Sequence, residues 1–305
     1  MKTDCVVVTY NRLDLLRENV GALMRQTHLP RQIFIVDNHS TDGTSEWLDQ
    51  NLKDKPRFVV IHLPENTGGA GGFCEGMKRA VEGGADWIWV MDDDTIPAPT
   101  ALEELERAIL VVPEVAFACS KVVWTDGSLH QMNLPAVERD AEGHPRLFTA
   151  GGCEVARCSH CSFVSSMFRA SAIRQVGLPI REFFIWMDDV EFTCRLSDQG
   201  FTGLYVPASS VLHKTPGNMP PSLSQAPVGS EWKYYYFARN HVYFTRQRKK
   251  SRLAFWFSVL NRWRPYLHWV SRRTDGPEGR RVFRRAVCRG LRDGLRFKPS
   301  VEFPH

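Results

Sequence analysis

Three aspartates in a row, Asp92 to Asp94, directly follow a short, fully apolar run at 87–91. Such a run is typical of a strand that is buried on both faces. Adjacent carboxylates at the mouth of a buried strand repel one another unless a cation lies among them. Because side chains alternate along an extended strand, we expect Asp92 and Asp94 on one side and Asp93 on the other. The pattern therefore predicts a divalent metal held by the oxygens of Asp92 and Asp94, although acids in this position also cap a following helix.

Strands and helices alternate through the first 113 residues. Apolar runs at 5–8, 32–36, 58–63 and 87–91 each precede an amphipathic segment, and Asn11 is expected to cap the first helix. The runs end at polar residues, namely Thr9, Asp37, Asn66 and Asp92. The alternation predicts an α/β fold with a mostly parallel sheet and helices on both faces. Ligands bind such sheets beyond the carboxyl ends of the strands, where these polar residues lie.

The second half of the chain is less regular. It predicts a buried strand at 161–168 and a helix that is capped by Asp188 or Asp189 and ends at Gly200. The first residues, MKTDCVVVTYNR, show no secretory signal, and the chain has no apolar run of about 18 residues. We therefore expect a cytoplasmic protein whose eight scattered cysteines are reduced thiols.

The net charge of +5 is distributed unevenly along the 305 residues. Residues 246–305 contain 17 Lys and Arg against 4 Asp and Glu, a net charge of +13. We therefore predict a domain at 1–245, with a first half at 1–113 and a second at 114–245, and a basic, aromatic-rich helical tail at 246–305.

Six segments occur in a characteristic order along the chain. They are VVVTYNR at 6–12, IVDNHSTDGT at 35–44, ENTGGAGGF at 65–73, WVMDDDTIP at 89–97, FFIWMDDVEF at 183–192 and VLHKT at 211–215. Together they resemble the inverting family 2 glycosyltransferases, which have a Rossmann-like, metal-dependent GT-A fold. The resemblance covers roughly residues 4–245. NTGGAGGF, DDD, WMDDVEF and the later KYYYFARNHVYF are most similar to bacterial galactofuranosyltransferases and rhamnosyltransferases.

The resemblance implies roles on the donor side. Asp94 would ligate Mn²⁺ or Mg²⁺, Asp92 would face the ribose and share the metal site, and His213 would be a third ligand, with a purely structural histidine as the alternative. Asp37 would bind the nucleotide base, unless it only forms a turn. The glycines at 68–72 would approach the diphosphate, or would only permit a tight turn. The other expected donor contacts are Thr9, Tyr10, Asn11, Arg12, Asn66, Gly68, Gly69 and Asp93.

The acid pair Asp188 and Asp189 is the candidate catalytic site. Inverting transfer needs a base that removes the proton of the acceptor hydroxyl, and a helix N-terminus keeps a carboxylate ionised. The resemblance places the base at Asp189 and lets Asp188 orient the acceptor or the base; both acids would otherwise only cap the helix. Expected acceptor contacts are Trp186, His160 and Glu191.

A cluster of cysteines offers an alternative use of His160. Cys153, Cys158, His160 and Cys161 could bind zinc, but standard zinc sites use two separated pairs of ligands.

The tail contains LAFWFSVLNRWRPYLHWVSRR. Its apolar residues share one broad face, broken or kinked at Pro265, namely Phe255, Trp256, Val259, Leu260, Trp263, Leu267 and Val270. Aromatic residues beside arginines suit a helix on an anionic membrane surface. Packing on the core or on a second subunit is the alternative, and the sugar-nucleotide motifs argue against nucleic acid as the partner.

These observations favour a metal-dependent inverting glycosyltransferase at the inner face of the cell membrane. The donor would be UDP-galactofuranose or, nearly as well supported, dTDP-rhamnose. The acceptor would be a lipid-linked or cell-surface glycan in cell wall or polysaccharide biosynthesis, and a homo-oligomer is compatible with the sequence. The rival from another class is a catalytically silent scaffold subunit that binds the nucleotide sugar.

Overall fold

The computed structural model describes residues 1–110, 112, 114–150, 152–219 and 222–305. The chain forms two compact units, which are described separately. Unit 1 comprises Met1–Arg181, Asp189–Met219 and Val301–His305, and unit 2 comprises Glu182–Asp188 and Pro220–Ser300. Residue 245, where the sequence predicts a domain boundary, lies inside a helix of unit 2. Residue 113, the predicted boundary between the two halves, lies outside the described residues.

Unit 1 is built on one mixed sheet. Its strands are β1 (Thr3–Thr9), β2 (Ile33–Asp37), β3 (Phe58–His62), β4 (Trp87–Asp92), β5 (Thr95–Pro97), β6 (Val115–Val123), β7 (Ala136–Val137), β8 (Phe148–Ala150), β9 (Cys153–His160), β10 (Ser166–Arg169) and β11 (Thr202–His213). The order in the sheet is β3-β2-β1-β4-β10-β6-β11-β9-β7, with β5 paired to β11 and β8 to β9. The first four strands in this order are parallel, whereas β10 is antiparallel to both of its neighbours. The predicted α/β sheet is confirmed.

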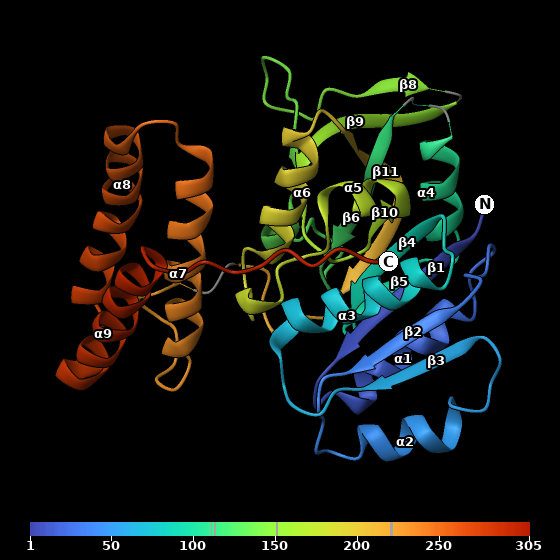
Figure 1. Cartoon of the computed structure of the whole chain (residues 1–305), viewed down its shortest axis with the longest axis horizontal. Coiled ribbons are helices and arrows are strands. Elements are labelled where there is room, and N and C mark those ends of the chain that lie inside the picture. Colours follow the sequence, from blue (N-terminus) through green and yellow to red (C-terminus); the bar gives the residue numbers. More distant parts are fainter. Residues whose placement is uncertain (111, 113, 151, 220–221) are drawn as a thin grey trace. The chain divides into compact units, whose positions relative to one another are not determined.

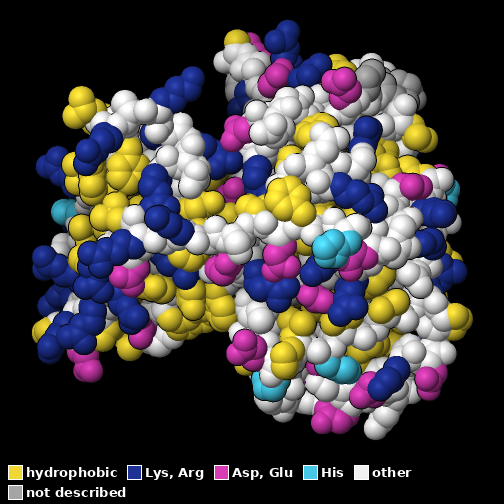
Figure 2. Space-filling model, viewed as in Figure 1, with side chains coloured by type: hydrophobic (Ala, Val, Ile, Leu, Met, Phe, Trp, Pro, Cys, Tyr) yellow, Lys and Arg dark blue, Asp and Glu magenta, His cyan; other side chains and the backbone are white. Residues whose placement is uncertain are grey.

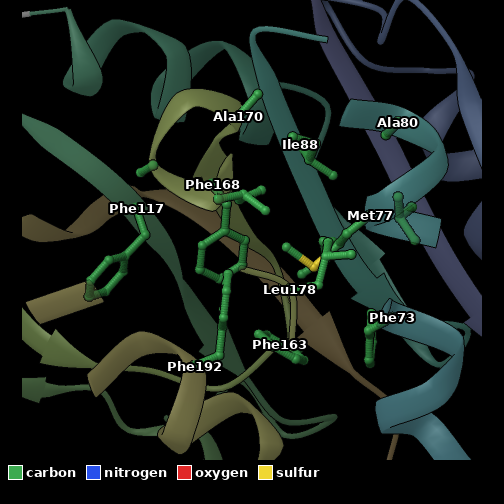
Figure 3. Close-up of a cluster of buried hydrophobic side chains, with 14 of the residues drawn as sticks. Phe73, Met77, Ala80, Ile88, Phe117, Phe163, Phe168, Ala170, Leu178 and Phe192 are labelled. Carbon is green, nitrogen blue, oxygen red and sulfur yellow. The ribbon is translucent and has the colours of Figure 1, made fainter. Parts of the chain in front are cut away.

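Helices cover both faces of the sheet (Figure 1). They are α1 (Leu13–Leu23), α2 (Thr44–Asn51), α3 (Gly68–Glu82), α4 (Ala101–Ile109), α5 (Ala170–Val176) and α6 (Asp188–Asp198). Alternate residues of β4 enter different cores: Ile88 lies in one hydrophobic cluster and Trp89 in the other. Figure 3 shows the first cluster, in which Phe73 of α3 and Phe168 of β10 meet Phe163. Strand β4 is therefore buried on both faces, as its apolar sequence predicts.

Two local predictions in unit 1 are wrong. Asn11 does not cap α1: its backbone φ is +53°, and its side-chain Oδ1 accepts a hydrogen bond from Thr41 N at 2.7 Å instead. The strand expected at 161–168 begins only at Ser166. Ser165 has a φ of +58°, which interrupts an extended chain at that residue.

Unit 2 is helical. It contains α7 (Glu231–Arg248), α8 (Arg252–Ser271) and α9 (Gly276–Gly294), with Pro265 inside α8. The apolar residues predicted to share one face of α8 are divided between core and surface. Phe255, Val259 and Trp263 are buried with residues of α7 and α9, whereas Leu260 is 65% exposed. Among the described residues, no helix is both long and apolar enough to cross a membrane.

Glycines in α3 allow this helix to lie close to β1. A Cβ atom at Gly76 would be 2.4 Å from Val6 Cγ1 and 3.0 Å from Val36 Cγ2, and one at Gly72 would be 2.6 Å from Val8 Cγ1. A Cβ at Gly69 would meet nothing within 4 Å. Close helix–strand packing therefore explains Gly72 and Gly76, whereas Gly69 faces open space.

We predict that Gly76→Ala lowers the free energy of unfolding by about 1–3 kcal/mol, because the added methyl overpacks a core whose β-branched neighbours cannot rotate away. Gly69→Ala is the matched control in the same helix and should lose no stability. Urea denaturation followed by circular dichroism measures both. Equal stability of the two variants would contradict the packing explanation.

Candidate active site

Parallel strands bring the predicted site residues to one edge of unit 1. In the sheet register, Thr9 at the end of β1 lies beside Asp37 at the end of β2. Asp92, the last residue of β4, lies beside Val8 on the other side of β1. These side chains therefore converge at the carboxyl edge, as the strand–helix alternation predicts.

The three consecutive aspartates face different partners. Asp93 Oδ2 accepts a hydrogen bond from Thr9 Oγ1 at 2.8 Å. Arg12 Nη1 donates to Asp93 Oδ1 at 3.2 Å and to Asp94 Oδ2 at 2.6 Å. Thr9 and Arg12, predicted as donor contacts, thus hold the buried acids in place. Burial raises the pKa of Asp93 to about 6, although Arg12 acts to lower it.

A third element delivers a histidine to the same acids. Strand β5 pairs with β11 so that His213 lies opposite Thr95, and Lys214 N donates to Asp94 O at 2.9 Å. His213 Nε2 consequently lies 3.1 Å from Asp94 Oδ1. One ligand atom each from Asp92, Asp94 and His213 lie within 4.8 Å of one another. The structure therefore brings together the three residues that the sequence assigns to the metal.

The chemistry of this cluster fits a divalent cation. Asp94 Oδ1 is buried and, apart from its contact with His213 Nε2, has no hydrogen-bond partner among the described residues. Burial, together with the charges of Asp94, Asp93 and Asp189, raises the pKa of Asp92 to about 8. Burial alone would also raise the pKa of Asp94, but His213 and Arg12 outweigh it and hold that pKa below its usual value. Two carboxylates and an imidazole form an oxygen-rich set that suits Mn²⁺ or Mg²⁺.

Asn133 orients His213 toward the acids. The amide Nδ2 of Asn133 donates a hydrogen bond to Ser162 Oγ at 3.0 Å. Its Oδ1 therefore faces His213 Nδ1 at 2.8 Å and can accept a hydrogen bond from that nitrogen. With Nδ1 held by Asn133, Nε2 is the ring nitrogen that faces Asp94 and would ligate a cation. No local sequence pattern indicates Asn133, because the histidine that it contacts lies 80 positions further along the chain.

A second histidine beside the site, His130, is likewise not indicated by any sequence pattern. Its ring centroid is 4.6 Å from that of His213, and its Nε2 lies 2.8 Å from Thr215 Oγ1. Burial and the neighbouring His213 lower the pKa of His130 to about 4. His130 is therefore neutral near pH 7 and adds no positive charge behind the metal ligands. It stands in WTDGSLHQMN, a segment that matches no motif.

The loops after β1, β2 and β3 are tied to one another by side chains. Asp37 is buried and accepts hydrogen bonds from Ser40 N at 3.0 Å and from Ser45 Oγ, and it faces His62 Nδ1 at 2.9 Å. Burial alone would raise the pKa of Asp37, but these hydrogen bonds outweigh it and lower the pKa. These hydrogen bonds are those of a residue that stabilises a turn, which was the alternative role of Asp37. Binding of the nucleotide base by Asp37 stays a prediction. Tyr10, one of the predicted donor contacts, is largely exposed.

The glycine-rich loop is fixed by two asparagines. Asn66 Oδ1 accepts hydrogen bonds from Gly68 N at 2.8 Å and from Asn38 Nδ2 at 3.1 Å. Gly68, with a φ of +72°, opens α3. The sequence left open whether the glycines serve a turn or a ligand. The positive φ assigns a turn to Gly68, whereas Gly69 faces open space and its contact with the diphosphate stays a prediction.

Asp189 is the acid of the second pair that belongs to unit 1. Its Oδ1 accepts a hydrogen bond from Val190 N at 2.7 Å. Burial nevertheless raises the pKa of Asp189 to about 6, so desolvation outweighs the helix N-terminus that was expected to keep this carboxylate ionised. The charge of Asp189 also contributes to the raised pKa of Asp92, which shows that the candidate base and the metal site share one electrostatic environment.

The other predicted acceptor residues have structural partners. Glu191 is buried and forms an ion pair of 2.9 Å with Arg195. His160 ends β9, where Nδ1 lies 3.4 Å from Ser159 Oγ. Trp186 belongs to unit 2 and packs edge-on against Tyr234. Asp188 is the first residue of α6 and belongs to unit 2, and its role stays a prediction.

The zinc alternative is not supported by the described residues. Among them, the only group of three or more potential ligands within metal-binding reach of one another is Asp92, Asp94 and His213. Cys153 Sγ instead accepts a hydrogen bond from Arg107 Nε at 3.1 Å. Cys158 and Cys161 are buried thiols.

Comparison with known proteins identifies related sequences. The sequence profile described as Glycosyl transferase family 2 matches residues 4–177. Galactofuranosyltransferase GlfT1 of Mycobacterium tuberculosis is 31% identical over 201 residues, which cover 64% of this chain and 64% of that relative. The N-acetylglucosaminyl-diphospho-decaprenol L-rhamnosyltransferase of the same organism is 24% identical over 247 residues, covering 68% of this chain and 74% of that protein. The match to the first relative thus spans less than two thirds of its length.

Two solved structures share the fold. A crystal structure of GalNAc-T7 with UDP, GalNAc and Mn²⁺ has a TM-score of 0.59 and 16% identity, and the match covers 79% of this chain and 51% of that one. The mannosyltransferase PcManGT from Pyrobaculum calidifontis, in complex with GDP-Man and Mn²⁺, has a TM-score of 0.53 and 15% identity. That match covers 94% of this chain and 74% of the other. Both are GT-A-like structures.

We predict that Asn133→Ala weakens Mn²⁺ binding by about 10- to 100-fold, because the imidazole of His213 loses the group that orients it. His213→Ala should weaken binding at least as much, whereas His144→Ala, which removes an exposed loop histidine, should leave it unchanged. Electron paramagnetic resonance of free Mn²⁺, recorded in a titration with UDP present, measures the three affinities. Wild-type affinity in His213→Ala would contradict the assignment of the ligands.

Proposed function

The chain belongs to glycosyl transferase family 2, and from this premise we propose that it is a metal-dependent inverting enzyme. It transfers a sugar from a nucleoside diphosphate to a lipid-linked or cell-surface glycan. The observation that carries the proposal is the convergence of Asp92, Asp94 and His213 within electrostatic range of the partly buried carboxylate of Asp189. This arrangement combines a cation site with a candidate base at one edge of one sheet.

The acids and the histidine would hold Mn²⁺ or Mg²⁺ against the diphosphate of the donor. The metal supplies Lewis-acid neutralisation of the charge that develops on the leaving nucleoside diphosphate. Arg12 keeps Asp93 and Asp94 in position through its two hydrogen bonds. The Mn²⁺ named in the two similar solved structures favours a divalent metal of this kind.

Asp189 would remove the proton of the attacking hydroxyl. Its Oδ1 is fixed by Val190 N, so Oδ2 is the oxygen that can accept this proton as the acceptor oxygen bonds to the anomeric carbon. Attack from the face opposite the leaving group inverts the configuration. A pKa of about 6 makes Asp189 a stronger base than an ordinary aspartate while it remains mostly ionised at pH 7.

Galactofuranose is the favoured sugar. The relative at 31% identity is named a galactofuranosyltransferase, and the one at 24% is named a rhamnosyltransferase. UDP-galactofuranose is therefore the first donor to test and dTDP-rhamnose the second. The name of the rhamnosyltransferase also includes a diphospho-decaprenol group, which supports a lipid-linked acceptor.

The basic helices of unit 2 support attachment to a membrane surface. Leu253, Phe257 and Leu260 of α8 are 85%, 72% and 65% exposed. They follow Arg248, Lys249 and Lys250 in a segment where cationic and large apolar side chains can both contact an anionic leaflet. We propose that the protein acts in the cytoplasm at the inner face of the cell membrane.

We predict that Asp189→Asn reduces sugar transfer by about 10²- to 10⁴-fold and leaves UDP affinity unchanged, because the amide keeps the shape of the base but cannot take a proton. In the wild type, kcat/KM should rise with pH through about 6, and be about tenfold higher at pH 7 than at pH 5, since only the ionised carboxylate acts. Initial rates at saturating Mn²⁺ measure both effects. Residual transfer together with weakened UDP binding would contradict the role of Asp189.

Release of free nucleotide from a panel of nucleotide sugars tests the donor and the metal together. We expect UDP to be released from UDP-galactofuranose with Mn²⁺ and not with EDTA. Release of dTDP from dTDP-rhamnose alone would support the same mechanism with rhamnose, instead of galactofuranose, as the transferred sugar. Tight donor binding without turnover, even with lipid-linked acceptors added, would favour the rival function of a silent scaffold subunit.

A further inference from the structure

A groove with a volume of about 880 Å³ lies between α8 and α9 of unit 2. One wall carries Leu267 and His268 of α8, and the other carries Arg280, Arg281, Arg284 and Arg285 of α9. The four arginines recur at positions i, i+1, i+4 and i+5, so they form one stripe of the helix. Phe283 and Val287 of the same helix are buried in the core of unit 2. Their burial fixes the rotation of α9 about its axis, so that the arginine stripe faces the groove.

The groove is rich in positive charge, and of its four arginines only Arg280 lies near an acid, Asp275, among the described residues. Arg280 donates to the carbonyl oxygen of Arg273 at 3.0 Å. Within the part of the chain that the structure describes, Arg281, Arg284 and Arg285 form no ion pair with a carboxylate, whereas Arg289 and Arg292 of the same helix both contact Asp293. Planar guanidinium groups without acidic partners match the oxygens of a phosphate, which they bind through paired hydrogen bonds.

An exposed apolar stripe on α8 leads into this groove. Leu253, Phe257, Leu260 and Leu267 recur at i, i+4, i+7 and i+14, a spacing that places them on one face of the helix. The first three are largely exposed, and Leu267 lines the groove. Figure 2 shows dark-blue basic side chains gathered among yellow hydrophobic ones over the helices at the left. A ligand here would meet cations at one end and an apolar track at the other.

We propose that this groove binds the diphosphate of a polyprenyl-linked glycan, with the arginines of α9 on the phosphates and the α8 stripe along the first isoprene units. The proposal rests on the proposed function, because it assigns a place to the lipid end of the acceptor. Its lining contains no Phe, Tyr or Trp ring on which a base could stack, His268 being its aromatic side chain, and no carboxylate or amide side chain for the polar edge of a base. This chemistry disfavours a nucleotide or a nucleic acid and favours a lipid diphosphate.

Cys288 provides a direct reporter of occupancy. It lines the groove and is exposed, whereas Cys194 is partly buried and the other cysteines are buried. Farnesyl diphosphate, a soluble polyprenyl diphosphate, should slow alkylation of Cys288 by N-ethylmaleimide in the full chain about tenfold at ten times its Kd. Mass spectrometry of the digested protein measures the rate at Cys288, with the rate at Cys194 as the internal reference.

Three further probes distinguish the source of the phosphate. Inorganic pyrophosphate should protect Cys288 more weakly than farnesyl diphosphate, and farnesol should not protect it. Equal protection by pyrophosphate would overturn the lipid part of the proposal. Protection by phosphatidylglycerol vesicles without protection by farnesyl diphosphate would overturn it in favour of a general membrane contact.

Substitution of the stripe tests the arginines. The triple variant Arg281→Ala, Arg284→Ala and Arg285→Ala should raise the Kd of farnesyl diphosphate at least about tenfold, because charged hydrogen bonds to phosphate are lost. The matched control is Arg292→Ala, an exposed arginine of the same helix outside the groove lining, which should change the Kd less than about twofold. Unchanged affinity in the triple variant would overturn the proposal.

Metal-dependent release of UDP from the donor, measured without any lipid, separates this inference from the proposed function. The triple variant should retain wild-type donor hydrolysis while losing farnesyl diphosphate binding. A wild-type protein that binds farnesyl diphosphate at Cys288 but turns over none of the tested donors, even with lipid-linked acceptors added, would contradict the proposed function and still support the groove as a lipid diphosphate site.

Discussion

Electrostatic repulsion among carboxylates at the end of β4 is the constraint on which the site depends. Asp92 to Asp94 lie together with Asp189 in surroundings that raise the pKa of Asp92 to about 8 and that of Asp189 to about 6. Arg12 only partly offsets the rise at Asp92, whereas His213 and Arg12 together hold the pKa of Asp94 below its usual value. Buried acids of one sign are stable only when cations or hydrogen bonds compensate them. In the proposed function, a divalent cation bound with the diphosphate of the donor would complete that compensation.

The sheet supplies the rigidity that such a cluster requires. Parallel pairing of β1 with β2 and β4 fixes where the polar strand ends lie, and the pairing of β5 with β11 brings His213 back to Asp94. Gly72 and Gly76 let α3 approach β1 closely, so the glycine-rich sequence serves packing inside the helix, and contact of its first turn with the donor stays a prediction. Each of these features places a functional side chain at the end of a rigid strand or helix.

Much of this arrangement could be predicted from the sequence, because buried strands and their polar ends have local patterns. The α/β order, the metal trio and the acid pair all lie in segments with such patterns. Asn133 and His130 could not be predicted, since they reach His213 only through tertiary contacts. The turn at Ser165 was missed for the same reason, as a positive φ at a serine has no signature in an apolar run. On α8, the sequence indicates an apolar face but not which of its residues the neighbouring helices cover.

Diffraction from crystals grown with UDP and Mn²⁺, recorded at a wavelength where manganese scatters anomalously, tests the metal site most directly. We expect one strong anomalous peak within coordination distance of Asp94, His213 and the diphosphate oxygens, with Asp92 beside it. UDP bound in the site without a peak there, or with the peak at other side chains, would contradict the assignment of the metal and with it the proposed mechanism.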